Sequence, residues 1–247
     1  MRRVAIVTGA GQEIGEASAL RFAEAGWSVA CVDGDEESVR QTAQRVESNG
    51  GRAIAVVADV ASAGGSRRMV DDTVQAIGRV DALHLNGPPR ITPAAEQPAL
   101  ADWDGLHAVT VRAAYLGIRQ VIPELRGSGG GAIVLTAGPA GIAADPHLAT
   151  MNGALRSLCR SVATGYGGDG IRINMICPGT VATRAEPAAA APGTEAALRE
   201  VAGHLPLRRL ASARDLANVA VFLASPEASY VTGTDVVMDG GLLALVS

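Results

Sequence analysis

The chain has 247 residues, 48% of them hydrophobic and 19% charged, and its formal net charge is −4, which suits one domain with a large core. The mildly acidic balance and the 3% aromatic content argue against a nucleic-acid surface, and no apolar run reaches the ~18 residues of a membrane span. The 3 cysteines are too widely spaced for a metal site, so we predict a cytoplasmic protein that binds no metal, nucleic acid or membrane.

Short apolar runs alternate with helical patterns along the whole chain. Strands are predicted at 4–8, 28–33, 53–59, 80–86, 132–136, 171–177 and 234–238. Helices are predicted at 14–25, 36–48, 66–77, 102–125, 148–164 and 212–224. Because the strands are continuously apolar, a parallel sheet buried on both faces is expected. The series predicts a single α/β domain over 1–247, a doubly wound parallel sheet with helices on both faces.

The turns that follow the strands are the places to look for a ligand, because such folds bind ligands beyond the carboxyl ends of their strands. Gly9, Gly11 and Gly15 lie between the first strand and the first helix, where glycines let a phosphate approach backbone N–H groups. Asp33 ends the second strand, where a carboxylate can accept hydrogen bonds from a ribose diol and repel a 2′-phosphate. These positions favour NAD over NADP.

Several segments in this order resemble the short-chain dehydrogenase/reductase family over nearly the whole chain. They are the turn 8–15, Asp33, the run 58–60, the run 78–81, the segment 170–179, and the C-terminal runs 224–233 and 239–241. The resemblance implies a Rossmann-like fold and a homo-oligomer, a dimer or tetramer whose interface the last helix and strand build. It also implies that Asp59 and Val60 contact adenine and that Pro178, Gly179 and Thr183 border nicotinamide. The implied cofactor contacts are Gly9, Gly11, Ile14, Gly15, Asp33, Asp59, Val60, Asn86, Pro178 and Gly179.

The resemblance breaks at the catalytic residues, which in this family are an Asn, a Ser, a Tyr and a Lys. The matching positions here hold Thr110, Gly138, Leu148 and Asn152. A second alignment register puts Met151 and Leu155 at the Tyr and Lys positions, and it supplies neither residue type. General acid catalysis contributes ~10²–10⁴ in rate and an oxyanion donor ~10²–10³. Standard carbonyl reduction is therefore expected to be nearly abolished.

Further departures concern the cofactor. Glu13 stands where the family has glycine, and a carboxylate a few ångströms from a pyrophosphate costs ~1–4 kcal/mol. Pro88 and Pro89 stiffen the loop expected to border the ribose. The residues therefore leave NAD binding open. The segment 185–197, rich in Ala, Pro and Gly, is expected to be a flexible flap over the site or a loose connection.

Other polar residues are candidates to replace the missing groups. Thr110, Thr136, His147 and Asn152 are the groups expected to face the pocket, with Asp145 near His147, although an exposed loop position is the favoured interpretation of His147. His84 lies inside a strand and is expected to be a core histidine with its hydrogen bonds satisfied. Cys177 is expected to be inert.

Three hypotheses follow. The first is a non-catalytic member, or pseudoenzyme, that acts as a ligand-binding or partner subunit, including in a hetero-oligomer with an active relative. The second is a cofactor-independent isomerase, cyclase or lyase that uses the same pocket for a small-molecule ligand. The third is an NAD-dependent oxidoreductase with an atypical proton donor. The first is favoured slightly, because all the catalytic residue types are replaced.

Overall fold

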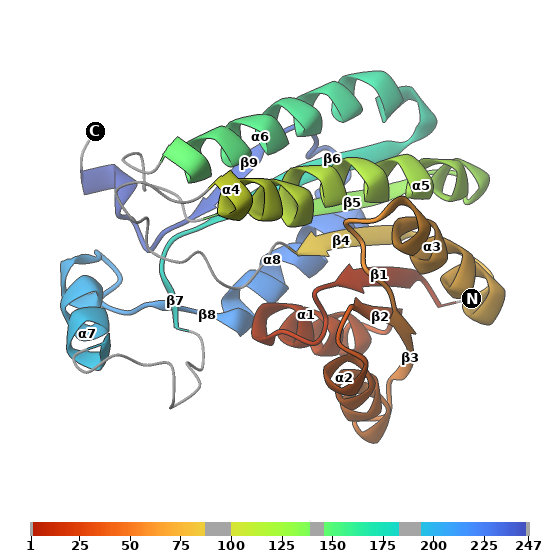
Figure 1. Cartoon of the computed structure of the whole chain (residues 1–247), viewed down its shortest axis with the longest axis horizontal. Coiled ribbons are helices and arrows are strands. Elements are labelled where there is room, and N and C mark those ends of the chain that lie inside the picture. Colours follow the sequence, from red (N-terminus) through yellow and green to blue (C-terminus); the bar gives the residue numbers. More distant parts are fainter. Residues whose placement is uncertain (1, 87–99, 139–145, 183–193, 246–247) are drawn as a thin grey trace.

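The structure is a computed structural model that describes residues 2–86, 100–138, 146–182 and 194–245. Its centre is a parallel sheet of 7 strands in the order β3-β2-β1-β4-β5-β6-β9 (Figure 1). The strands are β1 (Val4–Thr8), β2 (Ser28–Asp33), β3 (Arg52–Val57), β4 (Ala82–Asn86), β5 (Gly131–Thr136), β6 (Ile171–Pro178) and β9 (Asp235–Met238). The strand order reverses between β1 and β4, which opens a crevice at the carboxyl edge of the sheet.

Helices cover both faces of this sheet. They are α1 (Glu13–Glu24), α2 (Glu36–Ser48), α3 (Ala63–Ile77), α4 (Leu100–His107), α5 (Ala113–Gly127), α6 (Pro146–Tyr166), α7 (Thr194–His204) and α8 (Ala213–Ala224). A π-helical turn, Ala108–Arg112, joins α4 to α5, and the short strands β7 (Val181–Ala182) and β8 (Ala211–Ser212) pair outside the main sheet. The predicted doubly wound α/β fold is confirmed.

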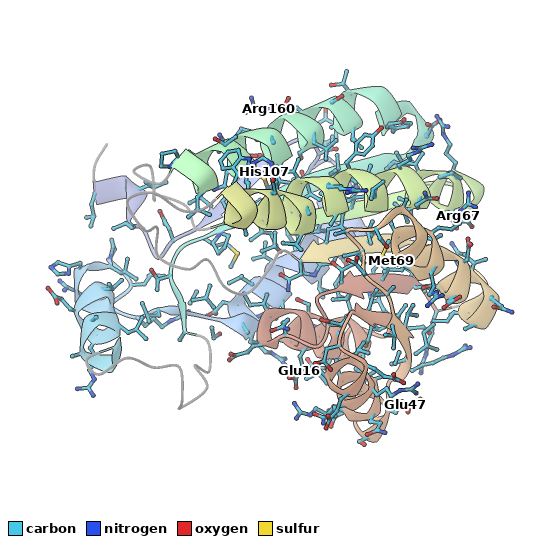
Figure 2. All side chains as sticks on the ribbon, viewed as in Figure 1. Glu16, Glu47, Arg67, Met69, His107 and Arg160 are labelled. Atoms are coloured by element: carbon cyan, nitrogen blue, oxygen red, sulfur yellow. The ribbon has the colours of Figure 1, made fainter. Side chains whose placement is uncertain are left out.

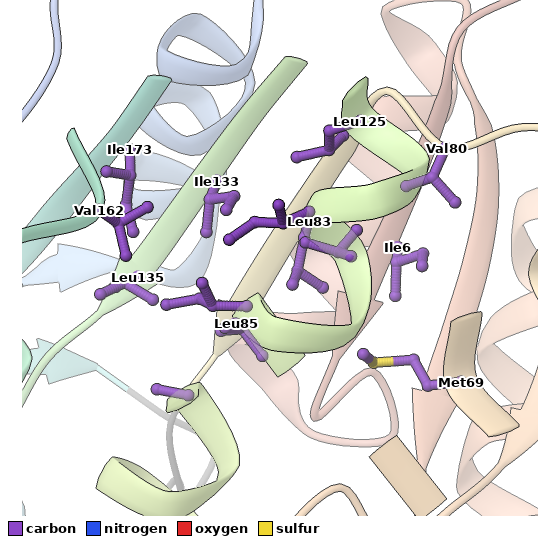
Figure 3. Packing of buried hydrophobic residues seen from close by; sticks show 14 of the residues in the cluster. Ile6, Met69, Val80, Leu83, Leu85, Leu125, Ile133, Leu135, Val162 and Ile173 are labelled. Carbon is purple, nitrogen blue, oxygen red and sulfur yellow. The ribbon is translucent and has the colours of Figure 1, made fainter. Parts of the chain in front are cut away.

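Two hydrophobic cores lie on opposite faces of the sheet. One packs α3, α5 and α6 against side chains such as Ile6, Leu83 and Ile133 (Figure 3). The other packs α1, α2 and α8 against the alternate strand positions, including Val7 and Val134. Because side chains alternate between the two faces of a strand, a strand that serves both cores is apolar at every position. This explains the continuous apolar runs of the sequence.

Charged side chains lie on the outside of these layers. Figure 2 shows Glu47, Arg67 and Arg160 projecting from exposed helix faces, whereas Met69 points toward the core. No helix within the described ranges combines the length and apolarity that crossing a membrane requires.

Most predicted elements are confirmed to within a few residues, with three differences. The third strand ends at Val57, not at 59. The long helix expected over 102–125 is interrupted by the π-helical turn at Ala108–Arg112. Residues 194–197 of the expected flap belong to helix α7, and residues 185–193 lie outside the described ranges, so the flap stays a prediction.

Candidate functional site

The candidate site lies at the carboxyl edge of the sheet, around the point where the strand order reverses. A cavity there is lined by residues from β1, β4, β5, α5 and α6, from the loop after β3 and from the π-helical turn. These residues are Thr8, Val60, Leu85, Asn86, Val109, Thr110, Ala113, Ala114, Leu135, Thr136 and Leu155. The cavity therefore brings together strand ends that the sequence predicts to carry a ligand.

The glycine turn between β1 and α1 packs its backbone very tightly. Gly9 has a φ of +61°, which favours glycine, and a Cβ at Gly15 would lie only 2.0 Å from the Gly9 carbonyl oxygen. The Ala10 N–H donates to the Val32 carbonyl at 3.1 Å, which ties the turn to β2. The side chain of Gln12, the N-cap residue of α1, makes no capping hydrogen bond. The turn thus presents the start of α1 at the sheet edge.

Asp33 lies beside this turn, as the sequence predicts. Its Oδ2 accepts a hydrogen bond from the Gly11 N–H at 3.0 Å, and its Oδ1 accepts one from the Asp35 N–H at 3.1 Å. A Cβ at Gly11 would come within 3.1 Å of Asp33 Oδ2, so glycine is needed for this approach. One strand further out, the exposed Asp59 accepts a hydrogen bond from the Ala61 N–H at 3.0 Å. Asp33 is the last residue of β2, and Asp59 lies two residues beyond the end of β3, the neighbouring strand.

Asn86 and Thr8 connect the ends of β1 and β4. The Asn86 N–H donates to Thr8 Oγ1 at 3.1 Å. The Asn86 side-chain Oδ1 is buried and has no hydrogen-bond partner among the described residues. A buried acceptor of this kind normally has a partner, so this oxygen is suited to receive a donor from a ligand or a water molecule.

Two contacts join residues at the expected catalytic positions of one register or the other. The Thr110 hydroxyl donates to the Leu106 carbonyl at 2.5 Å and lies 3.1 Å from Met151 Sδ. Asn152 Oδ1 accepts from the Gly138 N–H at 3.0 Å, and Asn152 Nδ2 donates to the Gly138 carbonyl at 3.4 Å. The Asn152 amide therefore ties α6 to the end of β5.

The apolar residues of both alignment registers line the inner side of α6. Leu148, Met151 and Leu155 are all buried, with exposed fractions of 2%, 3% and 4%. Their side chains carry no group that ionises near neutral pH.

A buried polar pair, not foreseen as a pair, lies within the sheet. His84 Nε2 is 2.9 Å from Thr136 Oγ1, and the His84 ring lies 6.4 Å from the ring of Phe22 in α1. Burial lowers the pKa of His84 to about 4, so its ring is neutral at physiological pH. Its Nδ1 has no partner among the described residues, which contradicts the expectation of a fully satisfied core histidine. Only tertiary pairing of β4 with β5 reveals this contact.

The far end of the site is formed by β6 and the turn after it. The Gly179 N–H donates to the Met238 carbonyl at 2.8 Å, and a Cβ at Gly179 would lie 2.7 Å from the Asp239 Cα. Burial raises the pKa of the Cys177 thiol to about 11, which agrees with the expected inert cysteine. Thr183, Pro88, Pro89, Asp145 and the side chain of His147 lie outside the described residues.

The comparisons with known proteins agree with this geometry. A family model described as enoyl-(acyl carrier protein) reductase matches residues 9–243. The chain belongs to the short-chain dehydrogenase/reductase family. The 2-(R)-hydroxypropyl-CoM dehydrogenase of Xanthobacter autotrophicus is 35% identical over 255 residues, which cover 99% of this chain and 100% of that protein.

Solved structures of the family superpose closely on this one. The L-sorbose reductase of Gluconobacter frateurii, complexed with NADPH and L-sorbose, gives a TM-score of 0.90 at 30% identity over 98% of this chain and 97% of its own. A 7α-hydroxysteroid dehydrogenase complexed with NADH and 7-oxo glycochenodeoxycholic acid gives 0.87 at 31% identity over 97% and 93%.

These relatives correct the functional prediction made from the sequence. The expectation of a non-catalytic member, or pseudoenzyme, is wrong, because family members that match over almost the whole chain are dehydrogenases and reductases solved with NADH or NADPH. The physical reason is that the prediction counted the missing proton and oxyanion donors and the unfavourable cofactor contacts, and gave no weight to the positioning of the reactants. Holding two reactants side by side lowers a barrier by ~7–11 kcal/mol, whichever group supplies the proton.

Proposed function

We propose that the chain is a nicotinamide-dependent oxidoreductase that interconverts an alcohol and a carbonyl compound. The observation that carries this proposal is the corner formed by the glycine turn, the start of α1 and Asp33, where Asp33 Oδ2 accepts the Gly11 N–H at 3.0 Å. The relatives named above, which act on alcohols or ketones, support the same reaction class.

The residues present suit a dinucleotide. Glycines at positions 9, 11 and 15 remove three side chains from the turn before α1, and Gly15 packs so closely on the Gly9 carbonyl that an added Cβ would lie 2.0 Å from its oxygen. Backbone N–H groups at a helix start attract a pyrophosphate. The proposed contacts are those implied by the family resemblance: Gly9, Gly11, Ile14, Gly15, Asp33, Asp59, Val60, Asn86, Pro178 and Gly179.

We propose NAD(H) as the preferred form of the cofactor. Asp33 keeps its carboxylate at the end of β2, the place where a ribose diol is bound and where a 2′-phosphate would meet a like charge. Glu13, half-buried at the first position of α1, opposes the pyrophosphate and weakens binding of either form. The two carboxylates act differently, because only Asp33 distinguishes the two cofactors.

The proposed route of the proton differs from the usual one. The nicotinamide ring, when bound, supplies or accepts the hydride. We place Thr110, Gly138, Leu148 and Asn152 at the family's catalytic positions, and none of these side chains ionises near neutral pH. The proton then reaches the product oxygen through hydroxyl groups and water in the cavity, whose lining includes Thr110 and Thr136.

Calorimetric titration with NADH and NADPH, followed by turnover of a panel of secondary alcohols and ketones, tests this function. We expect NADH to bind at least ~10-fold more tightly than NADPH, a difference of ~1.4 kcal/mol. Asp33→Ser should remove that preference while keeping NADH binding measurable. If the chain bound neither cofactor, or turned over substrate without one, the proposal would be wrong.

We also propose that the chain forms a homo-oligomer through α8 and β9. β9 is an edge strand of the main sheet, and Phe222 and Val237 expose 46% and 47% of their surface. Exposed apolar residues beside an open strand edge favour association. Sedimentation should show a dimer or tetramer that Val237→Lys weakens, and a chain that stays monomeric at micromolar concentration would contradict it.

A further inference from the structure

The function proposed above gives His84 no role, and it gives Thr136, the hydrogen-bond partner of His84, only a place among the hydroxyl groups of the cavity lining. Both side chains are buried, with exposed fractions of 1% and 8%, and they lie on the face of the sheet that α1 covers. A polar pair in an otherwise apolar layer costs desolvation free energy. Thr136 is the last residue of β5, at the carboxyl edge of the sheet, where a bound molecule can reach it.

The position of the His84 proton follows from its surroundings. A neutral imidazole carries one N–H, and a buried N–H without an acceptor is rarer in proteins than an acceptor without a donor. Because Nδ1 has no partner among the described residues, we place the proton on Nε2, which then donates to Thr136 Oγ1 at 2.9 Å. The Thr136 hydroxyl proton is thereby turned away from His84 and remains available to another acceptor.

The order of the strands shows which part of a dinucleotide meets this hydroxyl. Asp33 ends β2 on one side of β1, whereas β4 and β5 lie on the other side. Neighbouring strands are ~4.8 Å apart, so the tip of β5 lies ~10 Å from the tip of β1. A dinucleotide with its adenosine at Asp33 and its pyrophosphate at α1 therefore extends its other half over β4 and β5. Asn86, the partner of Thr136 in the strand register, has a buried Oδ1 that also lacks a partner among the described residues.

We propose that Thr136 donates a hydrogen bond to the carboxamide oxygen of the nicotinamide ring, and that His84 is the positioning residue that aims this hydroxyl. This inference rests on the proposed function, because it requires a nicotinamide cofactor. His84 acts as a fixed neutral donor and exchanges no proton during turnover. The pair adds a contact to the nicotinamide end from the α1 face of the sheet, opposite the face that carries α6.

Calorimetric titration of the full chain with NADH and with ADP-ribose tests the proposal, because ADP-ribose lacks only the nicotinamide ring. Thr136→Val, which removes the hydroxyl and keeps the shape, should weaken NADH binding about three- to tenfold. Its ADP-ribose affinity should stay within about twofold. Thr136→Ser is the matched control and should restore NADH binding. His84→Leu should weaken NADH to a similar extent, and its combination with Thr136→Val should add little.

His84→Gln retains an N–H donor, and it serves if the leucine variant does not fold. The proposal would be overturned if Thr136→Val changed the affinities for NADH and ADP-ribose equally, or changed neither. It would also be overturned if the effects of the His84 and Thr136 substitutions simply added, since a positioning residue acts through its partner. Failure of the unmodified chain to bind either ligand would instead refute the proposed function, and this inference with it.

Discussion

Replacing His84 by leucine should change how the stability of the protein depends on pH. Burial holds the pKa of His84 at about 4 in the folded chain, against 6.5 for the ordinary side chain, and no charged group contributes to this shift. Above pH 6.5 the ring is neutral in both states, so the stability is at its full value. As the pH falls from 6.5 toward 4, the unfolded chain gains a proton that the folded chain excludes.

Each unit of difference between the two pKa values is worth ~1.4 kcal/mol, so His84 alone should lower the free energy of unfolding by about 3 kcal/mol across this range. Urea unfolding at half-unit pH steps and fixed protein concentration measures this fall in the free energy of unfolding. In His84→Leu this fall should disappear, while substitution of the exposed His204 by glutamine serves as the control. An equally steep fall in His84→Leu would show that the histidine is not buried in its neutral form.

The remaining predictions concern the glycine turn, a helix cap and the charge beside the cofactor. Gly15→Ala should lower the free energy of unfolding by more than ~2 kcal/mol, because its Cβ would lie 2.0 Å from the Gly9 carbonyl oxygen. The control is Gly153→Ala, whose Cβ would meet nothing within 4 Å, and it should be neutral or stabilising in the same urea assay. Ser212→Ala should lower the free energy of unfolding by ~1 kcal/mol, because it removes the capping box of α8. An unchanged urea midpoint would contradict this prediction. Glu13→Gln should tighten NADH binding at least about fivefold, and the gain should shrink as salt is added to the calorimeter cell.

The sheet and its helices could be predicted because their causes are local in the sequence. The strands β1 and β2 and the helix α2 match their predicted bounds, since continuous apolar runs mark strands buried on both faces. The end of β2 and the start of α2 are also marked chemically. Asp35 caps α2 by accepting the Ser38 N–H at 2.9 Å, which is the kind of signal a sequence displays directly.

The interruption between α4 and α5 could not be predicted in the same way. Ala108, Val109 and Val111 are apolar like residues of the flanking helices, so the pattern gives no sign that the turn there is π-helical. π-Helical turns occur frequently at functional sites, and this one carries Thr110 into the lining of the cavity. The Thr110 hydroxyl donates a hydrogen bond to the Leu106 carbonyl of the preceding turn, a contact that no sequence pattern marks.

The two halves of the candidate site were predictable to different degrees for one physical reason. The half proposed to bind adenosine contains Gly11 and Asp33, whose places follow from adjacent strand ends, and the Gly11 nitrogen lies 3.0 Å from Asp33 Oδ2. The half proposed to bind nicotinamide contains pairs such as Gly138 with Asn152, and His84 with Thr136, which are formed by tertiary packing. A family pattern shows which residue type is missing at a single position. It does not show which side chain, distant in the sequence, packs beside that position in the fold. Because catalysis rests on the whole arrangement, the functional conclusion drawn from the missing types alone was the one that failed.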